Sequence, residues 1–81
     1  MIIKDLNSKL NEYIKTHQLV KKYKKAKALF ENHIHHLSLN VEILEPKHLR
    51  IYSFRIDLKY RAIFIIVNDE AEVITITKHY Q

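Results

Sequence analysis

Two stretches with the periodicity of β-strands occupy the last third of this chain and are joined by a short polar turn. Between residues 52 and 57 apolar and polar side chains alternate, which is typical of a strand with one buried and one polar face. Residues 60–67 are apolar on both faces after Arg61, which predicts a central strand covered on both sides. The Asn-Asp-Glu segment that follows predicts a turn into one more strand.

Helical periodicity governs the first half of the chain. Apolar residues recur at helical spacing in two series with a break near residues 16–18, so we expect a hairpin of two amphipathic helices. Short connections between the later strands favour antiparallel pairing. The predicted fold is therefore α+β, with two N-terminal helices packed on a small antiparallel sheet, and residues 1–81 form a single domain. Strands are expected at residues 41–44, 49–57, 59–67 and 72–78.

Composition limits the class of protein. The chain has no cysteine, which excludes disulfides and zinc–thiolate sites and is typical of a reducing compartment. No apolar run approaches the ~18 residues of a membrane span, and the first residues do not resemble a signal peptide, so a cytoplasmic location without membrane contact is expected. The chain also lacks glycine, so left-handed backbone positions are expected at Asn32, Asn40, Asn68 and Asp69.

The net charge of +5 is concentrated in the N-terminal third. Residues 1–27 hold eight lysines and two acidic residues, whereas residues 28–81 hold six basic and seven acidic residues. Five of the lysines lie between residues 21 and 27, a density that favours contact with a phosphate backbone. A solvated helix face is the more common role of such a charge run, because charge runs are frequent on helices.

The polar side chains of the last third permit RNA cleavage without a metal. Attack by the RNA's own 2′-hydroxyl needs a proton acceptor, a cation for charge on the phosphorane and a donor for the departing 5′ oxygen. Arg55 points away from the predicted core and Arg61 begins its strand, where it is expected to reach solvent, and either can grip a phosphate. His79 is the best candidate for general acid or base, and Tyr80 can stack on a base or share in proton transfer.

The loop before the first long strand supplies further candidates. Glu45 is a candidate catalytic carboxylate, and Lys47 and His48 are candidates for binding the substrate. Arg50 and Lys59 add two basic side chains to the substrate-binding set. No cofactor is expected.

The same candidates also have structural interpretations. Arg61 can pair with Asp57 or Glu72 across the hairpin, and His79 and Tyr80 can be an ordinary chain end. Asp57 is better suited to begin a turn than to take part in chemistry. A metal site is not expected at the histidines of residues 33–36, because helical ligand pairs prefer i, i+4 spacing and no acidic or cysteine set completes a tetrahedron.

The order of the motifs resembles that of a known family. The segments read Y-S-F-R-I, K-Y-R-A-I-F-I-I and I-T-K-H-Y, and residues 29–44 precede them with L-F-E-N-H-I-H-H-L-S-L-N-V-E-I-L. This order is similar to the RelE/ParE superfamily of bacterial type II toxins. Glu45-Pro46, Arg61 and His79-Tyr80 look most like the YoeB branch, the ribosome-associated mRNA endonucleases.

The resemblance implies an activity and partners. It implies an endonuclease that cleaves mRNA on the ribosome without a metal and so inhibits translation. It also implies a cognate antitoxin that wraps the toxin in a hetero-oligomer and blocks the site. Members of this family often have glycine in the loop before Ser53, where this chain has Pro46 and Arg50. We therefore expect this loop to follow a different path here.

Two other functions remain open from the sequence. A ParE-like inhibitor of DNA gyrase shares the fold but performs no chemistry, and a catalytically silent toxin fold can persist as a binding module. The arginines and the terminal His-Tyr pair favour the nuclease, since a protein that only binds needs no group for proton transfer.

Overall fold

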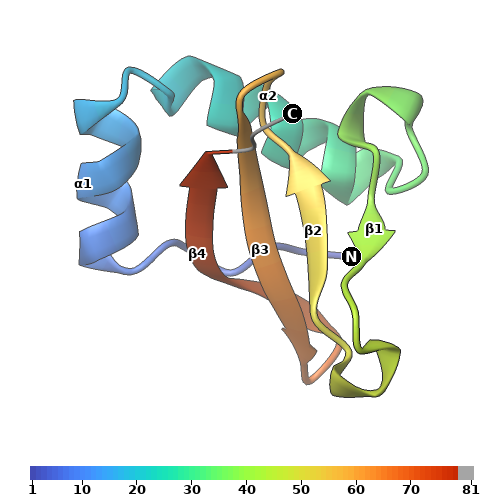
Figure 1. Cartoon of the computed structure of the whole chain (residues 1–81). Helices are drawn as coiled ribbons and strands as arrows, with labels where there is room; N and C mark the ends of the chain where they lie inside the picture. The colour runs from blue at the N-terminus through green and yellow to red at the C-terminus, as the bar shows by residue number, and fades with distance from the viewer. Residues whose placement is uncertain (79–81) are drawn as a thin grey trace.

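The computed structural model describes residues 1–78 and has the expected α+β order (Figure 1). Two helices come first, and four strands then form one sheet in the order β1-β2-β3-β4 with every neighbouring pair antiparallel. The predicted fold class is confirmed. The elements are α1 (Ser8–Thr16), α2 (Val20–Asn32), the 3-10 turns η1 (Leu37–Leu39) and η2 (Lys47–Leu49), and the strands β1 (Glu42–Ile43), β2 (Tyr52–Arg55), β3 (Tyr60–Val67) and β4 (Glu70–Lys78).

Local sequence sets where α1 begins and ends. The Asn7 side chain accepts a hydrogen bond of 2.8 Å from the Leu10 amide and caps the first turn. At the other end the chain turns at Gln18, which adopts a left-handed φ of 57°. The hairpin predicted near residues 16–18 is confirmed, although a glutamine rather than an asparagine takes the left-handed position.

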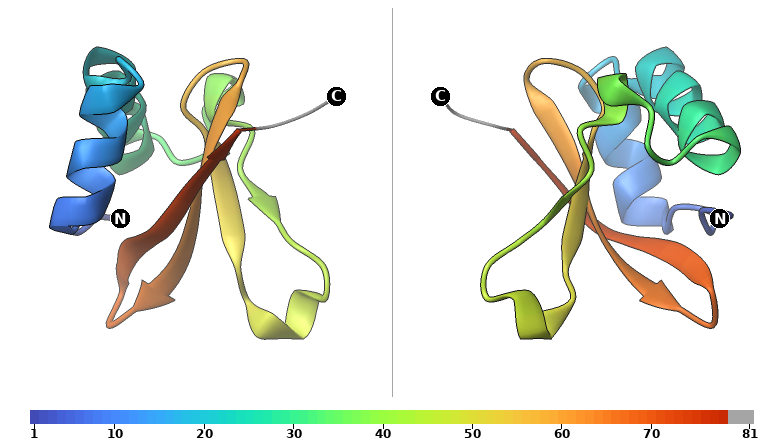
Figure 2. Two further views of the ribbon diagram at one scale, coloured as in Figure 1. Left: turned by 60° about the vertical axis from the view of Figure 1, so that its left-hand side comes forward. Right: turned by 90° about the vertical axis from the view of Figure 1, so that its right-hand side faces the viewer.

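Both helices cover the same face of the sheet (Figure 2). The core between them contains three mutually packed rings, with Phe30 of α2 centred 5.2 Å from Phe54 and 5.3 Å from Phe64. Within residues 1–78 no helix covers the opposite face, which is called the open face below. The prediction that both faces of β3 are covered was therefore wrong: β3 is central, but only one of its faces is covered, and Ile63 and Ile65 on the open face are half-buried.

The strands before β3 are shorter than the apolar pattern indicates. β1 covers two residues, and β2 begins at Tyr52 because residues 47–49 form η2 instead of continuing the strand. At the N-terminus Ile3 makes only an isolated parallel bridge to Ala71 at the edge of β4. Within residues 1–78 no helix is long and apolar enough to cross a membrane.

The turns show which residues replace glycine. Asn68 and Asp69 have φ values of 52° and 64° and form the tight β3–β4 hairpin, in which positive φ at both central residues matches the twist of the strands. Asn40 is also left-handed, with φ 43°. These three predictions are confirmed, whereas Asn32 is the last residue of α2 and the prediction for it was wrong. Arg50, with φ 53°, was missed.

Candidate active site

Arg61 is the anchor of a polar cluster on the open face. Its Nε donates a hydrogen bond of 3.0 Å to Ser53 Oγ on β2, and a terminal nitrogen donates to the Asn40 carbonyl. The same terminal nitrogen lies 3.3 Å from Glu42 Oε1 on β1. The guanidinium is thus held by three segments of the chain, and the residue is only 6% exposed.

This burial corrects two expectations for Arg61. It does not reach solvent freely, and it pairs with neither Asp57 nor Glu72, which instead bind Lys22 at 3.0 Å and Lys4 at 3.5 Å. The reason is tertiary. The segment that leads from η1 into β1 supplies the Asn40 carbonyl and the Glu42 carboxylate, and β2 supplies the Ser53 hydroxyl, so these groups surround the guanidinium.

Arg55 lies directly opposite Arg61 in the β2–β3 ladder. Burial lowers the pKa of the Arg61 guanidinium and the neighbouring Arg55 charge lowers it further, while Glu42 acts in the opposite sense. Arginine stays protonated in proteins despite such shifts. Two like charges with one carboxylate leave the cluster positive, so a second anion placed there would be stabilised.

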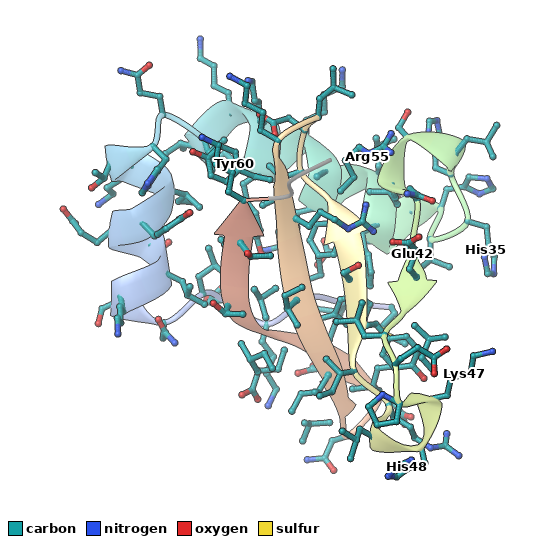
Figure 3. All side chains as sticks on the ribbon, in the orientation of Figure 1. His35, Glu42, Lys47, His48, Arg55 and Tyr60 are labelled. Carbon is teal, nitrogen blue, oxygen red and sulfur yellow. The ribbon has the colours of Figure 1, made fainter. Side chains whose placement is uncertain are left out.

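The cluster continues across β3 onto β4. Thr77 is the cross-strand partner of Arg61, and Thr75 is the partner of Ile63 on the same face. Figure 3 shows Arg55 and Glu42 near each other on the open face of the sheet. Cations, a carboxylate and hydroxyls therefore occupy one end of an exposed sheet surface.

The loop candidates lie elsewhere. Lys47 and His48 belong to η2, and Figure 3 shows them at the opposite end of the molecule from Arg55. Arg50 ends η2 ahead of β2, and Glu45 directly precedes the turn in a cis peptide bond with Pro46. The structure does not bring these four candidates to Arg61, because β2 runs its full length between η2 and the arginine pair.

Lys59 lies in the β2–β3 turn, beyond Arg55. Asp57 organises this turn, since its Oδ1 accepts hydrogen bonds of 2.8 Å from the amides of both Lys59 and Tyr60. Burial opposes ionisation of Asp57, but its hydrogen bonds from Lys22 and from the two amides prevail and lower its pKa. The prediction that Asp57 begins a turn is confirmed.

His79 and Tyr80 lie outside the residues that the structure describes, so their roles stay predictions. Glu42, by contrast, was missed by sequence reasoning. The sequence places Glu42 in the predicted strand at residues 41–44 but does not show which face of the sheet its side chain is on. Only the pairing of Glu42 with Ser53 shows that the two residues share a face. Asn40 contributes a carbonyl, which no side-chain pattern can reveal.

Two histidines of residues 33–36 and one lysine of residues 21–27 make local contacts. The rings of His33 and His36 are 6.0 Å apart, and His36 Nδ1 accepts a hydrogen bond from the Ser38 amide. Across residues 1–78, no three His, Cys, Asp or Glu side chains form a group that could hold a metal ion. In the lysine-rich stretch of α2, Lys27 lies 3.8 Å from Asp5.

A solved structure with the same fold belongs to a toxin–antitoxin complex. A chain of the heterotetrameric YoeB-YefM complex from Staphylococcus aureus matches with a TM-score of 0.64 and 20% sequence identity, over 95% of this chain and 100% of that one. The fold is that of a RelE-like toxin. No protein-family model matches the sequence, and no curated protein matches it.

Proposed function

We propose that this chain is the toxin of a type II toxin–antitoxin system and that it cleaves mRNA on the ribosome without a metal. The observation that carries the proposal is the cluster on the open face, where Arg61 is fixed between Glu42 and Ser53 with Arg55 directly opposite. A positive, preorganised surface of this kind suits a phosphate whose charge increases in the transition state.

Each side chain has a role in this proposal. Arg55, which is only half-buried, binds the scissile phosphate, and Arg61 stabilises the phosphorane from its fixed position. Glu42 takes the place that the sequence suggested for Glu45 and accepts the proton of the 2′-hydroxyl. His79 remains the proposed donor to the departing 5′ oxygen.

The donor set of the cluster supports the proposed metal independence. Mg²⁺ sites use carboxylates together with phosphate oxygens and water. Among the described residues of the cluster, Glu42 is the sole carboxylate, and Arg61 already holds it at 3.3 Å. Side chains then supply the charge stabilisation that a metal provides in other nucleases.

The proposed partner is a cognate antitoxin in a hetero-oligomer. The similar chain comes from a heterotetrameric toxin–antitoxin complex, and the +5 charge of this chain is suited to an acidic partner. Such a partner would also stabilise a chain of 81 residues, which buries only about 60–65% of the surface that it exposes when unfolded.

One observation favours a function without chemistry. Arg61 has its hydrogen bonds satisfied by Asn40, Ser53 and Glu42, as a structural arginine would. If Arg61 serves only to tie β1 and β2 together, the chain is a gyrase inhibitor or a silent binding module with the toxin fold.

Inducing the chain in cells distinguishes these functions. We expect translation to stop before DNA supercoiling changes, and Glu42→Gln to abolish this effect while the protein stays folded, because a neutral amide cannot accept the proton. Glu70→Gln, on the β3–β4 hairpin, is the matched control and should remain toxic. Loss of supercoiling first, or full toxicity of Glu42→Gln, would reject the nuclease.

A further inference from the structure

A second surface lies around the end of the sheet from the arginine cluster. A pocket of about 430 Å³ opens between the α1–α2 turn and the β2–β3 turn. It is called the sheet-end pocket here, and its main lining residues are His17, Lys22, Leu58, Lys59, Tyr60 and Lys78. The pocket thus combines aromatic rings with lysines, the combination that proteins use to hold single-stranded nucleic acid.

The rings in this pocket are fixed before any ligand arrives. His17 stacks on Tyr13 with centroids 3.9 Å apart and an interplanar angle of 22°, and its Nδ1 lies 2.9 Å from the Tyr13 carbonyl. Tyr60 meets His17 edge-on at a centroid distance of 5.7 Å. Leu58, which is 85% exposed, adds an apolar side chain to the same pocket. An aromatic corner beside an exposed apolar wall suits a planar base.

The residues within 1–78 that line the pocket carry a net positive charge. Among them Asp57 is the one carboxylate, and it already binds Lys22 at 3.0 Å and the two amides of its own turn. Lys59 brings a further positive charge to the rim, from the turn that leads into β3. Lysine binds phosphate as a compact point charge, so Lys59 suits a phosphate group rather than a carbonyl or an amide.

The register connects the pocket to the arginine cluster. Tyr60 pairs with Lys78 across β3 and β4, and the adjacent pair in the ladder is Arg61 with Thr77. Neighbouring residues on a strand point to opposite faces, so the pocket and the cluster lie on the two sides of the same sheet end. Figure 3 shows Tyr60 and Arg55 at this end.

From this arrangement we infer that the sheet-end pocket binds one nucleotide of single-stranded RNA that flanks the nucleotide held at the arginine cluster. The base packs against His17 and Tyr60, and a neighbouring phosphate binds Lys59. The inference rests on the proposed function, because it takes RNA as the substrate of the open face. It adds a binding site on the helix side of the sheet that cleavage itself does not use.

The test measures binding of a short fluorescein-labelled 2′-O-methyl RNA, which lacks the attacking hydroxyl and so stays intact, by fluorescence anisotropy at several salt concentrations. Lys59→Ala should lower the slope of log affinity against log salt by about 0.7, because one phosphate is no longer neutralised. The control Lys9→Ala removes the same charge from an exposed position on α1 outside the pocket.

A second pair of variants tests stacking apart from charge. His17→Ala should weaken binding roughly 5- to 150-fold, the usual effect of removing one stacking ring, and His17→Phe should restore most of it because a ring remains. Equal weakening by the pocket and control lysine variants, or no loss with His17→Ala, would overturn the inference, as would failure of the parent protein to bind this RNA.

The same assay separates this inference from the proposed function. Glu42→Gln should abolish cleavage of ordinary mRNA, and His17→Ala should weaken binding of the 2′-O-methyl RNA by the same factor in this background as in the parent protein, because Glu42 lies outside the pocket. If the pocket variants bind like their control while Glu42→Gln loses cleavage, the nuclease proposal stands and the pocket inference fails. If the pocket variants lose binding but the parent cleaves nothing, the pocket inference stands and the nuclease proposal fails.

Discussion

At the scale of single residues, burial decides what Arg61 contributes. The sequence predicted an arginine that reaches solvent, but the guanidinium is enclosed by groups from the η1–β1 connection, β1 and β2. Its removal would leave the Ser53 hydroxyl and the Asn40 carbonyl without their partner. Arg55, its half-buried neighbour, is the better probe of chemistry because fewer contacts depend on it.

We expect Arg61→Ala to lower the free energy of unfolding by about 1.5–3 kcal/mol, the usual contribution of hydrogen bonds to a charged group. The larger loss of ~3–5 kcal/mol for a fully buried pair does not apply, since the Glu42 side chain is 53% exposed. Arg55→Ala should change stability by about 0.5 kcal/mol or less and still lower cleavage roughly 10²–10³-fold. Urea unfolding and an mRNA cleavage assay check both, and equal destabilisation by the two variants would contradict this account.

Asp57 gives the protein a pH-dependent component of stability. Its pKa is lower in the folded state than in the unfolded chain, so the stabilisation is fully present above the unfolded pKa and is lost as pH falls through the folded pKa. We expect the free energy of unfolding of the parent protein to fall more steeply below about pH 4 than that of Asp57→Asn. Urea titrations from neutral to acidic pH measure the difference, and parallel curves would show that Asp57 contributes nothing.

At the scale of elements, turn chemistry rather than apolar pattern determines where β2 begins. Pro46 opens η2, and Arg50 closes it in a left-handed conformation that glycine usually provides. The strand therefore starts at Tyr52, where pairing with β1 and β3 becomes possible. The same turn holds Lys47 and His48 away from the arginine cluster.

Arg50→Gly tests this turn directly. The left-handed conformation destabilises a residue with a Cβ by roughly 1–2 kcal/mol, and glycine avoids this cost. Because glycine also makes the unfolded chain more flexible, about half of the gain in stability is lost. We expect a gain of about 0.5–1 kcal/mol in the free energy of unfolding and unchanged mRNA cleavage. Thermal unfolding measures the gain against Arg50→Lys, which keeps the Cβ, and a fall in cleavage would return Arg50 to the substrate-binding set.

At the scale of the whole molecule, the helices and the proposed chemistry occupy opposite faces of one sheet. The helices fill one face with apolar side chains, which leaves the other face free to present charged groups (Figure 2). The sheet carries these groups on paired strands, so their relative positions are set by the ladder. A rigid scaffold with an exposed polar face suits a macromolecular substrate.

If this face cleaves mRNA with side chains alone, cleavage should persist in excess EDTA and leave 2′,3′-cyclic or 3′-phosphate ends. The reason is that attack by the 2′-hydroxyl forms the cyclic product directly, whereas metal-activated water attacks from outside the ribose. Purified toxin and translating ribosomes, followed by analysis of the RNA ends, provide the measurement. Dependence on added Mg²⁺ beyond that needed by the ribosomes, or 3′-hydroxyl ends, would contradict the mechanism.

Periodicity and turn residues in the sequence were sufficient to predict the local elements and their order. Helical spacing predicted α1 and α2, alternation predicted β2, and Asn68-Asp69 predicted the β3–β4 hairpin, because each of these depends on residues close in the chain. The family resemblance pointed to the RelE-like fold that the structural match confirms.

Only the tertiary structure decided which polar groups meet. Glu42 reaches Arg61 through strand pairing between β1 and β2, and Asn40 does so through a backbone carbonyl, so neither contact leaves a pattern along the chain. Glu45 lies three residues from Glu42 in the sequence, yet it leads into the separate turn η2. Periodicity assigns a side chain to a face, whereas register and the path of the connecting segments determine its neighbours on that face.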